Sequence, residues 1–137
     1  MKDRIRTLSL RDQKAWFREY LPLFACSVFE NELTCRGTLQ PTPLSQIYSA
    51  VIFYIAGSRP RVFLPGKQLM RRDPDVAIPH TYSDTEPCLF YRSEWRSEMK
   101  IATSIVSWLV LWLNYYEIWR VTGEWLGGGI PHGTVKD

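Results

Sequence analysis

Residues 78–90, which read IPHTYSDTEPCLF, separate a strand-rich first half of the chain from a helical second half. The stretch is polar and bounded by prolines, and it ends close to a single thiol, Cys88. The chemistry of a cysteine depends on access to its thiolate rather than on its packing, so a thiol at the end of such a loop is a candidate nucleophile or acyl carrier. The rest of the sequence predicts the scaffold that presents this loop.

The residues before the loop predict one helix and four strands. A helix capped by Ser9 or Thr7 runs to about residue 20, where Leu21-Pro22 ends it. Strand patterns then cover residues 24–29, 32–39, 47–55 and 61–64, and the connections between them are short. Strands joined in this way pair most readily as an antiparallel meander.

A two-residue turn at Glu30-Asn31 fixes the register of the first two strands. This register pairs Phe29 with Glu32, Val28 with Leu33, and Cys26 with Cys35. The two thiols of the last pair face each other, so they can form a disulfide under oxidation. The alternative, which we favour for a reducing compartment, is that both are small buried side chains.

After the meander, residues 65–86 form a long loop rich in proline, and a loop of this length is usually functional. We expect a second helix from residue 94 to 120, capped by Ser93, with a break near Asn114 and a C-terminal cap at Gly123. The predicted fold is α+β, with one domain over residues 1–126 and a flexible, glycine-rich tail over residues 127–137. Trp108, Trp112 and Trp119 lie along a broad face of this helix that exceeds what one small sheet covers, so part of it is a candidate protein interface.

The composition excludes several classes of function. The chain has 137 residues, 45% of them apolar, and its net charge of +3 comes from scattered rather than clustered basic residues, which argues against nucleic-acid binding. The two histidines lie far apart and no Cys-x-x-Cys pair occurs, so we expect neither a metal nor another cofactor. The longest apolar run, residues 101–113, is shorter than the ~20 residues of a membrane span. We therefore expect a cytoplasmic protein.

The order of elements and the loop motifs resemble those of a ubiquitin-conjugating enzyme, in a short bacterial form, over residues 7–122. Residues 60–63 match the segment that ends the family's meander, Pro79-His80 stands at the place of its His-Pro-Asn motif, and Cys88-Leu89 follows at the place of the active cysteine. Trp95 matches the tryptophan that follows. The family's asparagine, thought to steady the oxyanion when a lysine attacks, is missing, which weakens the case for lysine ligation more than that for thioester formation.

Residues 122–132 resemble the end of short conjugating-like proteins from bacterial anti-phage operons of the CBASS class, which contain a cGAS-like oligonucleotide cyclase. The resemblance implies a transferase in which Cys88 carries the C-terminus of that nucleotidyltransferase as a thioester, and so regulates or primes it. No Gly-x-x-x-x-Gly-Lys-Ser/Thr motif for ATP occurs. An activating enzyme would therefore supply the energy, or the chain would attack its partner directly.

Four residues make up the predicted site. Cys88 is the nucleophile, and His80 is either a general base or a structural residue of the loop. Tyr82 or Asp84 can replace the missing asparagine if it reaches the oxyanion. No activating base adjoins Cys88 in sequence, which suits a thioester carrier better than a protease.

Two other functions stay open. The first is an inactive, conjugating-fold binding module that scaffolds a protein complex, in which Cys88 is a buried bystander. The second is a cysteine hydrolase that uses Cys88 with His80, although the sequence shows no third group to orient the histidine.

Overall fold

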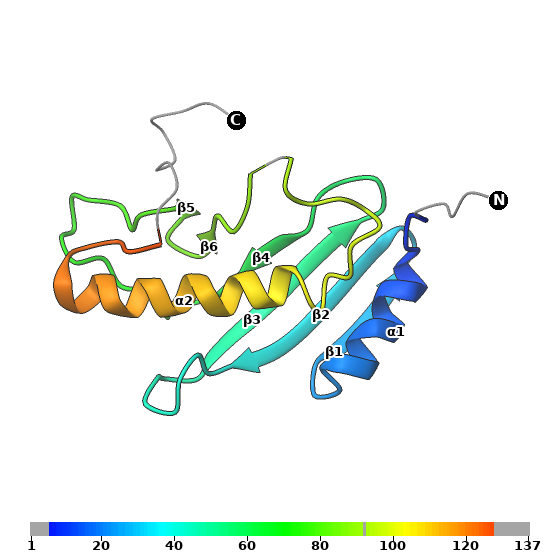
Figure 1. The fold of residues 1–137 in the computed structure, drawn as a ribbon, viewed down its shortest axis with the longest axis horizontal. Coiled ribbons are helices and arrows are strands. Elements are labelled where there is room, and N and C mark those ends of the chain that lie inside the picture. The colour runs from blue at the N-terminus through cyan, green and yellow to red at the C-terminus, as the bar shows by residue number, and fades with distance from the viewer. Residues whose placement is uncertain (1–5, 92, 128–137) are drawn as a thin grey trace.

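The computed structural model describes residues 6–91 and 93–127 and has an α+β architecture (Figure 1). Its elements, in chain order, are α1 (Leu10–Tyr20), β1 (Ala25–Phe29), β2 (Glu32–Leu39), β3 (Tyr48–Ile55), β4 (Arg61–Phe63), β5 (Thr81–Ser83), β6 (Glu86–Pro87) and α2 (Ile105–Thr122). The predicted order of helix, four-strand meander, loop and helix is confirmed. The small β5–β6 hairpin inside the long loop is an addition that the sequence pattern did not reveal.

Helix α1 begins at a capping box. The Ser9 hydroxyl accepts a hydrogen bond from the Asp12 amide at 3.0 Å, and the Asp12 carboxylate accepts one from the Ser9 amide at 2.9 Å. Of the two predicted caps, Ser9 is therefore the one used. These hydrogen bonds from Ser9 hold the pKa of Asp12 below its ordinary value.

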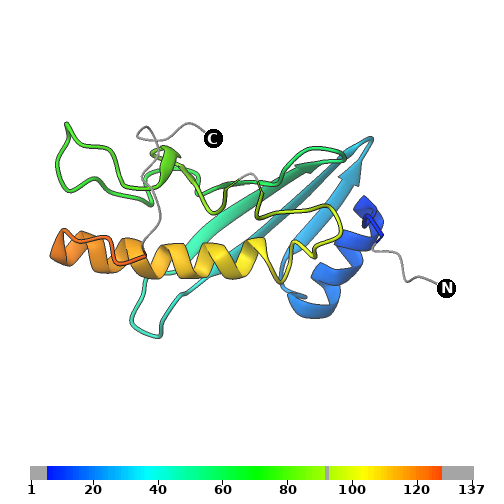
Figure 2. The ribbon, with the colours of Figure 1, turned by 45° about the horizontal axis from the view of Figure 1, so that its top comes forward.

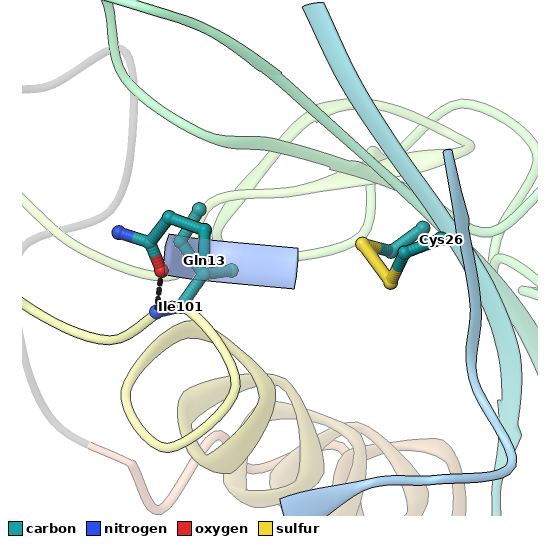
Figure 3. The surroundings of a disulfide bond; sticks show 4 residues. Gln13, Cys26 and Ile101 are labelled. Atoms are coloured by element: carbon teal, nitrogen blue, oxygen red, sulfur yellow. Dashed lines mark hydrogen bonds between the residues drawn. A yellow bond between two sulfur atoms is a disulfide. The ribbon is translucent and has the colours of Figure 1, made fainter. Parts of the chain in front are cut away.

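The main sheet has the strand order β1-β2-β3-β4, and every neighbouring pair is antiparallel. The predicted hairpin register is confirmed at all three pairs, Phe29 with Glu32, Val28 with Leu33, and Cys26 with Cys35. The last pair is joined by a disulfide (Figure 3), so the reduced pair that we favoured from the sequence is wrong for this structure. The register itself makes the bond possible, because it places the two side chains opposite each other on adjacent strands.

Both helices contribute to one apolar core. Phe17 of α1 and the buried side of α2 pack in one cluster with inward-facing sheet residues such as Leu33 and Ile52. Helix α2 runs along one face of the sheet (Figures 1 and 2). Its fully or nearly buried positions recur at helical spacing: Ile105, Val106, Leu109, Trp112, Leu113, Tyr116 and Trp119.

The second helix starts later than predicted. It begins at Ile105 rather than near residue 94, Ser93 does not cap it, and it continues through Asn114 without a break. The buried side chain of Gln13 explains the late start, because it donates to the Met99 carbonyl at 2.8 Å. It also accepts from the Ile101 amide at 2.9 Å, as Figure 3 shows. These backbone groups would otherwise be free for an α-helix. The predicted cap at Gly123 is confirmed, with φ of 81°.

Apart from Gly127, the predicted flexible tail lies outside the described residues. Within residues 6–91 and 93–127, none of the helices has the length and apolar character that crossing a bilayer requires.

Candidate functional site

The β5–β6 hairpin delivers Cys88 to its place. Thr81 pairs with Pro87 and Ser83 with Glu86 across the hairpin, and Cys88 follows directly after β6. The Cys88 amide donates a hydrogen bond to the His80 carbonyl at 2.8 Å. The backbone of the hairpin therefore brings Cys88 and His80, two of the predicted site residues, side by side.

His80 is held from three directions. Its backbone lies in the left-handed region, with φ of 53°, which is uncommon for a residue other than glycine. Its carbonyl accepts a second hydrogen bond, from the Trp112 indole at 3.0 Å, and its ring stacks on Trp125 with 5.1 Å between ring centroids. This geometry gives His80 a clear structural role in the loop, and its role as a general base stays a prediction.

The Cys88 thiol contacts two oxygens. Its sulfur lies 3.4 Å from the Tyr82 hydroxyl and 3.7 Å from the Phe90 carbonyl, both placed to accept from the S–H group. Only 9% of Cys88 is exposed, contrary to the open thiol that the polar loop suggested. The segment Leu89–Phe90 explains the difference, since its side chains pack against the apolar core and draw the preceding residue inward.

The Tyr82 hydroxyl therefore lies beside the sulfur, and its reach to an oxyanion stays a prediction. The residue itself is half exposed, at 52%. A hydroxyl can donate as well as accept, so the same oxygen that accepts from the neutral thiol can donate to a thiolate. The Phe90 carbonyl can only accept.

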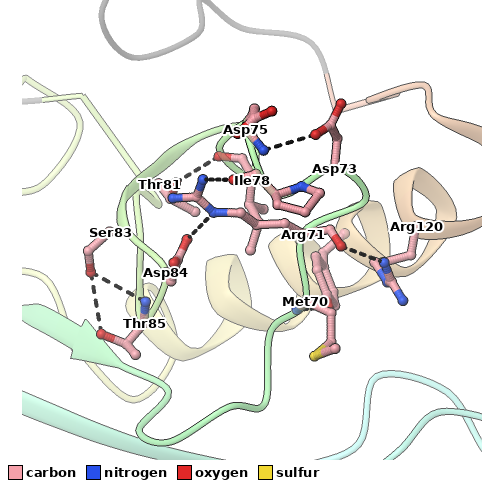
Figure 4. A network of polar contacts seen from close by, with 12 residues as sticks. Met70, Arg71, Asp73, Asp75, Ile78, Thr81, Ser83, Asp84, Thr85 and Arg120 are labelled. Carbon is pink, nitrogen blue, oxygen red and sulfur yellow. Dashed lines mark hydrogen bonds and ion pairs between the residues drawn. The ribbon is translucent and has the colours of Figure 1, made fainter.

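The Asp84 side chain forms an ion pair with Arg71. Its carboxylate accepts a hydrogen bond from the Arg71 guanidinium at 3.0 Å, and the same guanidinium donates to the Pro74 carbonyl at 2.9 Å (Figure 4). Arg120 of α2 in turn donates to the Arg71 carbonyl at 3.0 Å. Asp84 thus joins the hairpin to the proline-rich loop and, through Arg71, to the end of α2.

Glu86 is a site-supporting residue that the sequence reasoning missed. It is buried, with 7% exposed, and its two oxygens accept from the Arg61 guanidinium at 2.9 and 3.0 Å. The Glu86 carboxylate raises the pKa of Arg61, first through this hydrogen bonding and then through its charge. The pair ties β6 to β4 two residues before Cys88. No local pattern reveals it, since the partners are 25 residues apart.

A hollow of about 320 Å³ opens beside the thiol, and Cys88 is part of its lining. We call this hollow the aromatic groove. Its aromatic walls come from the segment after the thiol, from α2 and from the turn beyond it: Phe90, Tyr91, Trp108, Trp112, Tyr115 and Trp125. A second hollow of about 460 Å³, lined by Arg59, Arg61 and Tyr82, lies on the other side of Leu89 and Phe90, which line both. It is the larger of the two, but Cys88 lines only the aromatic groove.

Over the described part of the chain, no group of three or more histidine, cysteine or acidic residues is arranged to hold a metal ion. The chain is thus an α+β protein that presents a cysteine from a hairpin loop beside an aromatic groove. A protein-family model described as E2-CBASS, Type II CBASS E2 protein, matches residues 13–133, and the chain belongs to that family. No curated protein matches it. The family name supports an E2-like, conjugating-type role and protein partners within a CBASS system.

Proposed function

We propose that Cys88 carries the C-terminus of a partner protein as a thioester, and that this partner is a cGAS-like cyclase of the CBASS system. The observation that carries the proposal is the position of the Cys88 thiol beside a hydroxyl and a groove, in a chain of the Type II CBASS E2 family. An E2-like role requires a thiol that exchanges acyl groups, and the best attacking thiol balances its thiolate fraction against its intrinsic nucleophilicity.

The proposed step is an exchange of one thioester for another. The Cys88 thiolate attacks the carbonyl carbon of the partner's C-terminal thioester, held on a cysteine of an activating enzyme. A new bond between Cys88 Sγ and the carbonyl carbon forms, the old carbon–sulfur bond breaks, and the released thiolate takes up the proton that Cys88 lost. The partner's C-terminus then rests on Cys88.

Tyr82 is the residue best placed to assist this step. Its hydroxyl lies 3.4 Å from the sulfur, so it can donate to the thiolate before attack and lies near the developing oxyanion afterwards. We favour Tyr82 over Asp84 as the replacement for the missing family asparagine, because the Asp84 carboxylate is ion-paired with Arg71. A carboxylate would also repel an oxyanion rather than stabilise it.

One observation favours the second candidate, an inactive binding module that scaffolds a protein complex. Only 9% of Cys88 is exposed to solvent. Such burial is unusual for a thiol that must react with a protein-sized donor. In that function the fold would bind its partner without forming a covalent bond.

Co-expression with a cGAS-like cyclase and an activating enzyme of a CBASS system separates the two functions. Intact mass is measured for the wild-type protein, Cys88→Ser and Cys88→Ala, before and after treatment with a thiol reductant and, separately, with alkaline hydroxylamine. The thioester carrier predicts an adduct that reductant removes from the wild type, an oxygen ester on Cys88→Ser that resists reductant but not hydroxylamine, and no adduct on Cys88→Ala. A stable complex in all three proteins without any adduct would support the binding module instead.

A further inference from the structure

The disulfide between Cys26 and Cys35 lies at the edge of the main sheet (Figure 3). Strand β1, which carries Cys26, is the outer strand of the order β1-β2-β3-β4, and α1 packs against it. Cys35 on β2 is fully buried, whereas Cys26 is partly exposed. A small thiol in solution can therefore reach the sulfur of Cys26 but not that of Cys35.

A hollow of about 170 Å³, which we call the α1 hollow, opens beside Cys26. Its apolar lining includes Phe17 and Phe24, whose ring centroids lie 5.6 Å apart. Lys14 and Arg18 of α1 also line it, and none of its described lining residues is acidic. The accessible sulfur of the disulfide is thus approached through a hollow that carries positive charge.

The strand register suits a bond that opens and closes. Cys26 and Cys35 form one of five residue pairs between β1 and β2, so we expect the strands to stay paired when the sulfurs separate. The two thiols then remain opposite each other and can close again. Where glutathione keeps thiols reduced, as in the cytoplasm that the sequence predicts, a disulfide is usually transient and has a catalytic or redox-sensing role.

We propose that Cys26 and Cys35 form a thiol–disulfide exchange site for small anionic thiols such as glutathione. Cys26 is the sulfur that is attacked, Cys35 is the thiol that closes the bond again, and Lys14 and Arg18 attract the anion. This inference is independent of the thioester function proposed for Cys88.

The exchange proceeds in two steps. The thiolate of a glutathione molecule attacks Cys26 Sγ, a bond between these two sulfurs forms, the bond to Cys35 breaks, and the Cys35 sulfur takes up the proton that glutathione lost. A second glutathione attacks the glutathione sulfur of this mixed disulfide and releases Cys26 as a thiol. Two electrons pass to the protein, and the two glutathione molecules leave as their disulfide. Glutathione disulfide drives the same steps in reverse.

Reduction by two thiols of opposite charge tests the recognition. Glutathione, which has a net negative charge, or cysteamine, which has a positive one, is added to Cys88→Ser protein, whose remaining cysteines are this pair. The reaction is quenched with N-ethylmaleimide, and labelled thiols are counted by intact mass. Each rate is divided by that of the same thiol with hydroxyethyl disulfide, which removes intrinsic reactivity. We expect a normalised rate about three- to tenfold higher for glutathione, and a smaller difference in high salt.

A matched pair of variants on α1 locates the effect. Arg18→Gln and Arg11→Gln remove the same charge from exposed positions of one helix, but only Arg18 lines the α1 hollow. We expect Arg18→Gln to reduce the preference for glutathione and Arg11→Gln to retain it. Equal normalised rates for the two thiols on the parent protein would overturn the proposed recognition. Reduction by neither thiol without denaturant would show that the disulfide is only structural, which would overturn the exchange site itself.

Two further variants identify the sulfur that is attacked. In Cys35→Ser on the same background, Cys26 has no thiol to displace an adduct, so we expect glutathione disulfide to leave one stable glutathione on it. In Cys26→Ser, Cys35 is the remaining thiol, and its burial predicts no adduct until urea unfolds the protein. An adduct on folded Cys26→Ser but not on Cys35→Ser would contradict the assignment.

Discussion

The contact between Cys88 and Tyr82 reverses its direction when the thiol loses its proton. In the neutral state the S–H group donates to the Tyr82 hydroxyl or to the Phe90 carbonyl. Once the thiolate forms, Tyr82 can rotate its hydrogen toward the sulfur, whereas the carbonyl can offer only repulsion. Tyr82 is therefore the one of these two groups that stabilises the reactive form.

The variant Tyr82→Phe removes this donor and keeps the aromatic ring, at a residue that is half exposed. A hydrogen bond to a charged group contributes about 1.5–3 kcal/mol when buried and less at a half-exposed site. We expect alkylation of Cys88 by iodoacetamide at pH 7 to slow by about three- to tenfold, with an unchanged melting temperature. Ser83→Ala, on the same hairpin, is the control. A Tyr82→Phe rate equal to that of the wild type would mean that Tyr82 does not stabilise the thiolate.

At the scale of elements, the contact between β3 and α2 depends on one buried phenol. The hydroxyl of Tyr48 donates to a Glu117 oxygen at 2.7 Å, and the Ser45 hydroxyl donates to the other oxygen at 2.6 Å. Burial and then the Glu117 hydrogen bond raise the pKa of Tyr48 well above its ordinary value. The sheet and the helix are thus joined through a proton that the folded state retains.

This contact predicts a loss of stability in alkali. The unfolded tyrosine releases its proton near pH 10 while the folded one keeps it, so the free energy of unfolding falls as pH rises above about 10. Tyr48→Phe should cost about 1–3 kcal/mol at pH 7 and make the alkaline decline shallower, measured by urea unfolding between pH 7 and 11. The decline should persist in part, because the pKa of Tyr54 and that of Tyr116 are also raised. An unchanged slope would show that Tyr48 does not control it.

Gln13 predicts a second effect at this scale. The fully buried amide bonds to two backbone groups of the segment before α2. Gln13→Leu would leave both groups unpaired inside the core, at a cost of about 1–3 kcal/mol for each. We expect a large drop in the urea midpoint, against almost none for Lys14→Ala. A Gln13→Leu protein as stable as the wild type would mean that this segment finds other partners.

The same residues show how much of the fold and of the candidate site can be predicted from the sequence. Period and turn signals are local, so they located α1, the meander and its register, and the spacing from His80 to Cys88 predicts the candidate site. The start of α2 was misjudged because Gln13 acts on it across 88 residues. The Glu86–Arg61 pair was missed for the same reason. The burial of Cys88, which the sequence left as an alternative, also depends on packing against the core.

At the scale of the whole molecule, the chain after α2 returns to the loop that carries His80 and Cys88. Gly123 reverses the chain at the helix end, and Trp125 then stacks on the His80 ring while packing against Trp112. The His80 carbonyl holds the Cys88 amide. The hairpin loop and the turn beyond α2 therefore hold the thiol in place together.

Loss of Trp125 should loosen the loop rather than unfold the protein. Trp125→Ala removes the stack on His80, so we expect the Cys88 amide to exchange its hydrogen about tenfold or more faster, while amides of β2 and β3 keep their protection. Hydrogen exchange read by mass spectrometry over peptides that contain residue 88 measures this. Leu126→Ala, at an exposed neighbouring position, serves as the control. Equal exchange in the wild type and Trp125→Ala would show that the turn beyond α2 does not support the site.

The central claim is a covalent bond between Cys88 and the end of a partner chain. We would test it by peptide mapping with tandem mass spectrometry, on the adduct formed during co-expression with a cGAS-like cyclase and an activating enzyme. We expect one cross-linked species, in which the last residue of the cyclase is joined to Cys88 Sγ. Hydroxylamine should release the cyclase from it. A cyclase attached through an internal residue, or to a lysine of this chain with Cys88 unmodified, would contradict the account.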